Sequence, residues 1–134
     1  MLNERILIVD DNVGFCNTLQ KILTKFGYDS DVAHSRGDAL SFLKKDISLY
    51  LLDIGLPGSD EEGLDLLKEI KAYKPMASVI MITGNQNYEF LVNCISAGAA
   101  DFFYQVKAGC RLYENQLGTR VRKEKKLAFG YEKH

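Results

Sequence analysis

The sequence predicts an α/β fold in which five parallel strands form one doubly wound sheet with helices on both faces. Three observations lead to this prediction. Short apolar runs alternate five times with longer segments of helical periodicity. The runs carry almost no charge in their interiors, which is typical of strands that are covered on both faces. Turn-forming residues follow several of the runs, so these strands are expected to end where a loop begins.

The expected elements follow one another without a repeat or a low-complexity segment. The strands are expected at residues 5–9, 28–33, 48–52, 78–83 and 100–104. The helices are expected at residues 13–26, 38–45, 63–73, 87–97 and 111–127. Between them, residues 34–37 and 58–62 are expected to be loops. For five such units the strand order 2-1-3-4-5, known from flavodoxin-like domains, is the best supported choice.

Apolar residues spaced by three and four predict the buried face of each helix. Asn12 is expected to cap the first helix, and Gly27 to end it by adopting a left-handed conformation. Gly98 is expected to close the fourth helix. The inward positions of the fourth helix are expected to be Phe90, Leu91, Cys94 and Ile95, and those of the last helix Leu112, Leu117 and Val121.

Length and composition indicate a single domain. With 134 residues, 46 % of them hydrophobic and 26 % charged, the chain can bury a substantial core and remain in solution. We expect residues 1–127 to form the domain and residues 128–134 to be a C-terminal tail or the start of a linker. The net charge of −1 gives no overall field that would attract nucleic acid or a membrane.

The cysteines and the apolar runs indicate the compartment. Three widely spaced cysteines lack the spacing of metal ligands, and an odd count fits free thiols in a reducing environment. No apolar run approaches the roughly 20 residues that a membrane span needs. The chain enters its first strand without a signal-peptide pattern. A cytoplasmic protein is therefore expected.

Three carboxylates are the strongest candidates for a functional site. Asp10 and Asp11 follow the first strand, and Asp53 follows the third. In the order 2-1-3-4-5 these strands are neighbours, so the three side chains should lie together at the carboxyl edge of the sheet, where sites form in such folds. Clustered carboxylates repel one another and need a cation, and oxygen ligands favour Mg²⁺. A carboxylate can also act as a nucleophile toward a phosphoryl group.

Thr83 ends the fourth strand, which is the other neighbour of the third. Its hydroxyl could donate a hydrogen bond to a phosphoryl oxygen. The alternative is that Thr83 is simply a β-branched residue that fills the end of a strand.

Together these residues resemble the receiver domain of bacterial two-component response regulators. The likeness extends from Ile6 to about Val121. It depends on four segments at successive strand ends, each at the spacing of that family: Asp10-Asp11, Leu51-Leu52-Asp53-Ile54-Gly55-Leu56-Pro57, Val79-Ile80-Met81-Ile82-Thr83-Gly84 and Gly98-Ala99-Ala100-Asp101-Phe102-Phe103.

The resemblance implies a role for each matching position. Asp53 would be the phosphoacceptor. Asp11, Asp53 and the backbone carbonyl of Gly55 would bind Mg²⁺ directly, and Asp10 would act through water. Thr83 would be the switch hydroxyl. Phe102 occupies the position of the aromatic switch residue, often Tyr in this family, and plain core packing is the alternative for it.

The sequence departs from the family pattern in three places. Gln105 stands where the family has a Lys, and Val106 follows in place of a cis Pro. Lys107 is either a substitute for the missing charge or a solvated loop residue. The loop after Pro57 is about two residues longer than usual and carries the acids Asp60, Glu61 and Glu62. It is either a solvated loop or an element that a partner protein recognises. Gly55 offers no side chain over the pocket, which should leave attacking water less obstructed.

The resemblance implies a phosphoacceptor in a phosphorelay rather than an enzyme. Its partner would be a histidine kinase or a phosphotransfer protein, and phosphorylation would alter the face made by the expected helix 87–97, strand 100–104 and helix 111–127. That face could also form a homodimer. No helix-turn-helix follows the last helix, so direct nucleic-acid binding is not expected. The alternative is a degenerate receiver that works as a phosphorylation-independent interaction module, which Gln105 favours.

Two other chemistries on the same architecture fit poorly. A phosphatase that passes through an aspartyl intermediate would want a second Asp where Gly55 stands. Flavin binding would need a loop that cradles phosphate, whereas Asp10 and Asp11 at the first turn would repel it. The two histidines, His34 and His134, share no spacing with each other or with an acid, so neither is expected to be a ligand or a phosphohistidine. The basic stretch 120–126 is expected to be a solvated helix end, a contact for an acidic partner or a linker to a further domain.

Overall fold

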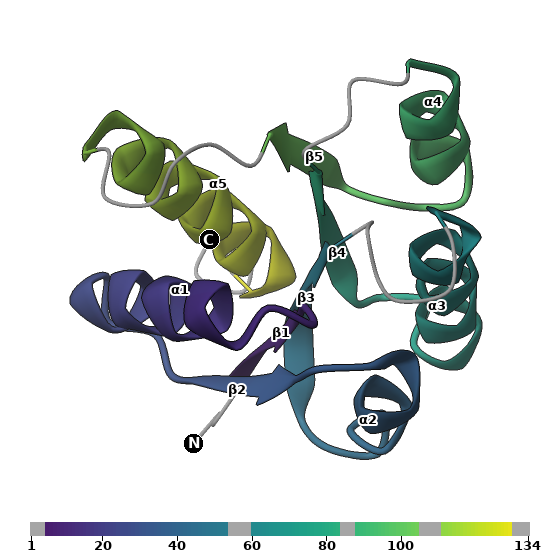
Figure 1. Cartoon of the computed structure of the whole chain (residues 1–134), viewed down its shortest axis with the longest axis horizontal. Helices are drawn as coiled ribbons and strands as arrows, with labels where there is room; N and C mark the ends of the chain where they lie inside the picture. The colour runs from purple at the N-terminus through teal and green to yellow at the C-terminus, as the bar shows by residue number, and fades with distance from the viewer. Residues whose placement is uncertain (1–4, 54–59, 84–87, 105–110, 130–134) are drawn as a thin grey trace.

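The structure is a computed structural model and describes residues 5–53, 60–83, 88–104 and 111–129 (Figure 1). Its strands are β1 (Arg5–Val9), β2 (Ser30–Ala33), β3 (Ile47–Asp53), β4 (Ser78–Thr83) and β5 (Asp101–Tyr104). Its helices are α1 (Val13–Lys25), α2 (Arg36–Leu40), α3 (Asp60–Tyr73), α4 (Tyr88–Ser96) and α5 (Arg111–Phe129). Each expected strand and helix is therefore present.

The strands form one parallel sheet in the order β2-β1-β3-β4-β5, which confirms the predicted topology. Helices α1 and α5 cover one face of the sheet, and α2, α3 and α4 cover the other (Figure 1). The central register pairs Val9 with Leu52 and Leu52 with Met81, so the carboxyl ends of β1, β3 and β4 lie at one edge. This edge is where the candidate site was expected.

The alternation of side chains along the strands divides the core in two. Ile6 and Ile8 point toward α1 and α5, whereas Leu7 and Val9 point toward the helices on the opposite face. All four side chains are at most 1 % exposed. Because both faces of the central strands are buried, the strand ends are held in a fixed position relative to one another.

The left-handed end of α1 explains why β2 is shorter than predicted. Gly27 has φ +89°, and the backbone N–H groups of Gly27 and Tyr28 donate to the carbonyls of Thr24 and Leu23. This Schellman motif uses Tyr28 in the helix cap, so β2 begins at Ser30 rather than at residue 28. Gly98 likewise has a positive φ of 111°, which confirms its expected place after α4.

Helix α2 differs most from its prediction. It begins at Arg36 because the Ser35 hydroxyl accepts a hydrogen bond from the Asp38 N–H, a capping contact that makes part of the expected loop helical. It ends at Leu40, although Phe42 and Leu43 continue to pack against the core. The apolar spacing that predicted a helix up to residue 45 therefore reflects side chains that pack against the core after the helix has ended.

Two further expectations about the helices are wrong. Helix α3 begins at Asp60, inside the segment expected to be a loop, and negative side chains are favourable near the N-terminus of a helix. Ile95 is 45 % exposed, whereas Leu91 and Cys94 are buried. Ile95 follows Cys94 by one residue, which turns it about 100° around the helix and away from the sheet. In α5, Leu117 and Val121 are buried as expected, and the side chain of Leu112 lies outside the described part of the structure.

Helices α1 and α5 approach closely at Gly118. A Cβ atom there would lie 2.4 Å from Cζ of Phe26, the residue that caps the C-terminus of α1. The guanidinium of Arg122 lies 5.5 Å from the centre of the same ring, and Lys25 forms an ion pair with Glu114 at 3.0 Å. The missing side chain at position 118 therefore makes room for the ring between the two helices.

Gly118→Ala is expected to change the free energy of unfolding in opposite directions, depending on which residue occupies position 26. A helical Ala is favoured over Gly by about 1 kcal/mol, but overpacking costs about 1–3 kcal/mol. We expect a net loss of about 1 kcal/mol in the free energy of unfolding when Phe26 is present, and a gain of about 1 kcal/mol in the Phe26→Ala background. Urea unfolding of the four proteins of this cycle measures both values. The same sign in both backgrounds would contradict the packing described above.

Candidate functional site

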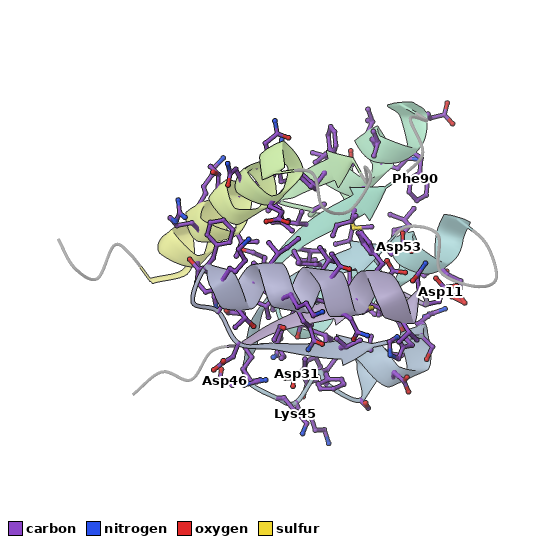
Figure 2. The ribbon with its side chains drawn as sticks, turned by 60° about the vertical axis from the view of Figure 1, so that its left-hand side comes forward. Asp11, Asp31, Lys45, Asp46, Asp53 and Phe90 are labelled. Atoms are coloured by element: carbon purple, nitrogen blue, oxygen red, sulfur yellow. The ribbon has the colours of Figure 1, made fainter. Side chains whose placement is uncertain are left out.

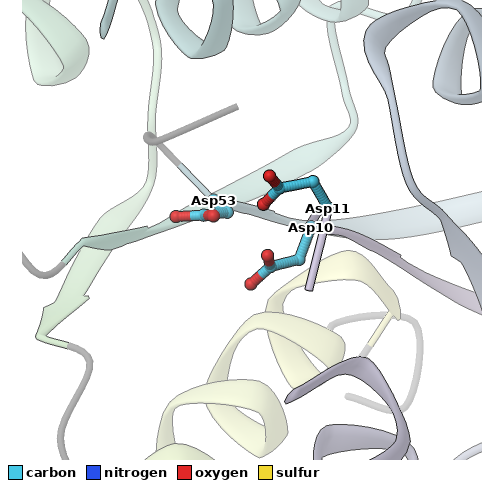
Figure 3. Close-up of side chains that lie close together, drawn as sticks. All are labelled: Asp10, Asp11 and Asp53. Atoms are coloured by element: carbon cyan, nitrogen blue, oxygen red, sulfur yellow. The ribbon is translucent and has the colours of Figure 1, made fainter. Parts of the chain in front are cut away.

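Three carboxylates converge at the carboxyl edge of the sheet (Figure 3). Asp10 and Asp11 follow β1, and Asp53 is the last residue of the neighbouring β3. One oxygen from each carboxylate lies within 4.8 Å of the others. Figure 2 shows Asp11 and Asp53 together at one end of the molecule, with Asp46 toward the other end of β3. The predicted convergence is confirmed, because the sheet order brings these strand ends side by side.

Asp10 is held in a fixed orientation at the base of this cluster. The residue is 2 % exposed, and its Oδ1 accepts a hydrogen bond of 2.9 Å from the backbone N–H of Asn12. Its Oδ2 is buried and has no hydrogen-bond partner among the described residues. Burial, which is the main cause, and the nearby charge of Asp53 together raise the pKa of Asp10 to about 7, although the hydrogen bond from Asn12 acts in the opposite direction.

The other two acids are more open to solvent. Asp11 is exposed, and Asp53 is intermediate in exposure between Asp11 and Asp10. Asn12 also caps α1, since its side chain accepts a hydrogen bond of 2.9 Å from the Phe15 N–H. The same short turn therefore starts α1 and presents Asp10 and Asp11 to the cluster.

The donor set fits a hard divalent cation. It consists of oxygen atoms, and among the described residues the buried Asp10 carboxylate has a hydrogen-bond partner for Oδ1, the Asn12 N–H, but none for Oδ2. Oxygen ligands of this kind suit Mg²⁺, which binds through one or two carboxylates and keeps several waters. Asp10, Asp11 and Asp53 would hold such an ion, which would neutralise the cluster and the charge of a bound phosphoryl group.

The remaining predicted site residues are only partly placed. Thr83 is the last residue of β4, one position beyond Ile82, which pairs with Asp53; its side chain lies outside the described part of the structure. Phe102 lies in β5 and packs partly buried against the core on the side of α2, α3 and α4. Gly55, Gln105 and Lys107 lie outside the described residues.

Two residues that the sequence did not single out contact this cluster. Nδ1 of His34 lies 3.0 Å from the carbonyl oxygen of Asp10, and Sγ of Cys16 lies 3.3 Å from the same oxygen. His34 was not expected to be a ligand, and its contact here is with the backbone of Asp10 rather than with the carboxylate; the contact arises because β2 ends beside β1. Burial, followed by the three nearby carboxylates, raises the pKa of Cys16 to about 12, which keeps its thiol protonated.

Comparison with known proteins gives the class that this fold and cluster define. Residues 6–107 match the family model described as the response regulator receiver domain. The chain belongs to this family, so it is a module of two-component signalling rather than a classical enzyme. Family members partner with histidine kinases.

Individual relatives agree with this assignment. The chain is 40 % identical over 98 residues to a putative response regulator NtrX-like of Rickettsia bellii, which covers 72 % of this chain and 20 % of that protein. It is 34 % identical over 110 residues to the transcriptional regulatory protein ZraR of Salmonella typhimurium, which covers 81 % and 24 %. The chain thus spans about a quarter or less of the length of these curated relatives.

Solved structures give the same result for the fold. The receiver domain of NtrX from Brucella abortus superposes with a TM-score of 0.77 at 34 % identity, over 89 % of this chain and 96 % of that one. A CheY-like receiver domain protein from Methanospirillum hungatei gives 0.76 at 30 % identity, over 92 % and 97 %. Among the described residues, no helix is both long and apolar enough to cross a membrane.

Proposed function

We propose that this domain is a phosphoacceptor that takes a phosphoryl group onto Asp53 in the presence of Mg²⁺. The observation that supports this most is the convergence of Asp10, Asp11 and Asp53, with one oxygen of each within 4.8 Å of the others and one buried oxygen of Asp10 that has no partner among the residues the structure describes. The donor would be a phosphohistidine on a histidine kinase or on a phosphotransfer protein.

The transfer would require an ionised, aligned Asp53 and a divalent cation bound beside it. An oxygen of Asp53 attacks phosphorus, the bond from phosphorus to the donor nitrogen breaks, and the imidazole leaves with the electron pair and takes up a proton. Asp11, Asp53 and the backbone carbonyl of Gly55 would bind Mg²⁺ directly, and Asp10 would act through water. When bound, the ion would offset charge on the phosphoryl oxygens.

Switching would follow from residues next to Asp53. The Thr83 hydroxyl would donate a hydrogen bond to a phosphoryl oxygen, and Phe102 would change rotamer with it. The response would reach the face made by α4, β5 and α5. On α4, Val92 and Ile95 are 42 % and 45 % exposed, and such apolar side chains suit a homodimer or an output partner at this helix. Direct binding of nucleic acid or of a membrane is not proposed.

Phosphorylation by a small donor tests this proposal. Acetyl phosphate with Mg²⁺ should add one phosphoryl group to the protein, seen by intact-mass spectrometry, and the adduct should be lost in mild base, as an acyl phosphate is. Chelation of Mg²⁺ should prevent the addition. A mass that stays unchanged with Mg²⁺ and excess donor would rule out phosphoacceptor activity under these conditions.

Gln105 supports a second candidate, a degenerate receiver that acts as an interaction module without phosphorylation. The family Lys supplies a positive charge to the phosphoryl group, and a neutral amide cannot replace that charge. The two candidates differ in how the domain responds once Asp53 is phosphorylated. Unchanged NMR signals of α4 and an unchanged oligomeric state after complete phosphorylation would favour the degenerate module, whereas shifts in α4 would favour the switch.

A further inference from the structure

We propose that His34 is a positioning residue that holds the peptide between Asp10 and Asp11 in the geometry of the acidic cluster. This inference rests on the proposed function where it concerns Mg²⁺, but its structural part concerns the metal-free protein. It follows from the way in which the β1–β2 ladder ends beside the cluster.

The ladder stops one residue short of the Asp10 carbonyl. Val9 pairs with Ala33 in the last position of the register, and the Asp10 N–H donates to the Ala33 carbonyl at 3.0 Å. In a parallel pair the next bond would come from the backbone N–H of residue 35. Ser35 instead caps α2, and its hydroxyl accepts from the Asp38 N–H at 3.1 Å.

The His34 ring provides a donor at this point. Its Nδ1 lies 3.0 Å from the Asp10 carbonyl oxygen, and the Cys16 thiol contacts the same oxygen at 3.3 Å. A carbonyl only accepts hydrogen bonds, so this contact is a hydrogen bond in the tautomer that carries a proton on Nδ1, which is the tautomer that the proposal requires. Two side chains, one from the end of β2 and one from α1, thus meet at a single carbonyl.

That carbonyl lies in the peptide plane that joins two acids of the cluster. Because the peptide unit is planar, fixing the Asp10 carbonyl also fixes the direction of the Asp11 N–H and the start of Asp11. In the same turn, the Asn12 N–H donates to Oδ1 of Asp10 at 2.9 Å. The His34 contact and the Asn12 contact together limit how Asp10 and Asp11 can turn relative to Asp53.

A set of metal ligands that is already held in place binds the ion more tightly, because less conformational freedom is lost when the ion binds. Outer partners of metal ligands commonly change metal affinity by 10–100-fold. His34 contacts the backbone rather than a carboxylate oxygen, so we expect the lower end of this range. Loss of the ring donor should raise the Kd for Mg²⁺ by about 10-fold.

Two substitutions at position 34 distinguish the effect of losing the hydrogen-bond donor from the effect of losing the volume of the ring. His34→Leu keeps apolar volume and removes the donor. His34→Asn places an amide N–H the same number of bonds from Cβ as Nδ1, so it should restore binding to within about twofold of wild type. The matched control is Gln20→Leu, because the Gln20 amide also donates to a carbonyl at β2, that of Ser30 at 3.3 Å, at the opposite end of the strand.

Two measurements test these variants. The first is the Kd for Mg²⁺ from calorimetric titration, which should rise in His34→Leu and stay at the wild-type value in Gln20→Leu. The second is amide hydrogen exchange of Asn12 in metal-free protein, which should quicken in His34→Leu and recover in His34→Asn. In wild type, the ¹⁵N shifts of His34 at pH 8 should show the tautomer protonated on Nδ1.

The outcomes distinguish the two proposals. Suppose that wild type binds no Mg²⁺, but exchange of the Asn12 amide is faster in His34→Leu and recovers in His34→Asn. The metal site is then wrong, and the positioning role stands. If wild type binds Mg²⁺ but His34→Leu changes neither the Kd nor the exchange, the positioning role is overturned while the proposed function stands. A His34→Asn variant as impaired as His34→Leu would also overturn it.

Discussion

Asp53→Asn is expected to remove phosphoryl incorporation from acetyl phosphate, with less than about 1 % of the wild-type rate remaining. The asparagine keeps the shape of the side chain but lacks an anionic oxygen that can attack phosphorus. Because Asp53 is the last residue of β3 and lies within 4.8 Å of Asp10 and Asp11, no backbone rearrangement is needed to bring the nucleophile to the ion.

The matched control is Asp46→Asn, which removes an exposed acid just before the start of β3. It changes the net charge by the same amount, so a general electrostatic effect on the approach of the donor would appear in both variants. Initial rates from intact-mass spectrometry should match wild type for Asp46→Asn. Equal incorporation in Asp53→Asn would mean that another residue accepts the phosphoryl group.

Asp10→Asn is expected to stabilise the metal-free protein at pH 8, by on the order of 2 kcal/mol in the free energy of unfolding. Burial raises the pKa of Asp10 to about 7 in the folded protein, above the ordinary value of 3.8. Between these values the folded state holds a proton that the unfolded state has lost, so rising pH removes stability across this window. The amide carries no charge and escapes this loss.

Urea unfolding without metal at several pH values measures the effect. The gain from Asp10→Asn should be small near pH 4, grow up to about pH 7 and then level off, whereas Asp46→Asn should show no such rise. Added Mg²⁺ should reverse the order, because wild type gains stability from the ion and the variant gains less. A variant less stable than wild type at pH 8 without metal would show that the charge of Asp10 is compensated within the protein.

The sheet and the acidic cluster were predictable because they depend on features visible along the chain. Runs such as residues 48–52 are apolar throughout, which marks strands buried on both faces, and the order of five β/α units then brings Asp10, Asp11 and Asp53 to one edge. Here pattern and topology were sufficient, since the side chains of interest stand directly at strand ends.

The features that the sequence did not predict depend on where individual helices and strands end, which helix capping decides as much as the apolar pattern does. The apolar positions of residues 38–45 suggested a longer helix, but the Ser35 cap moved the start of α2 to Arg36 and the hydrogen-bonded helix ended at Leu40. The contact of His34 with the Asp10 carbonyl arises from where β2 stops beside β1. Strand ends are uncertain by a few residues from sequence, so such a contact becomes visible only in three dimensions.

Paramagnetic broadening by Mn²⁺ in NMR spectra tests the central claim most directly, because Mn²⁺ also favours oxygen ligands and acts only on nearby nuclei. We expect the first amide signals lost to be those of Asp10, Asp11 and Asp53, and excess Mg²⁺ to restore them. Broadening centred on other acids, such as Asp29 and Asp31 near β2, or none at millimolar Mn²⁺, would contradict a divalent-ion site at this edge of the sheet.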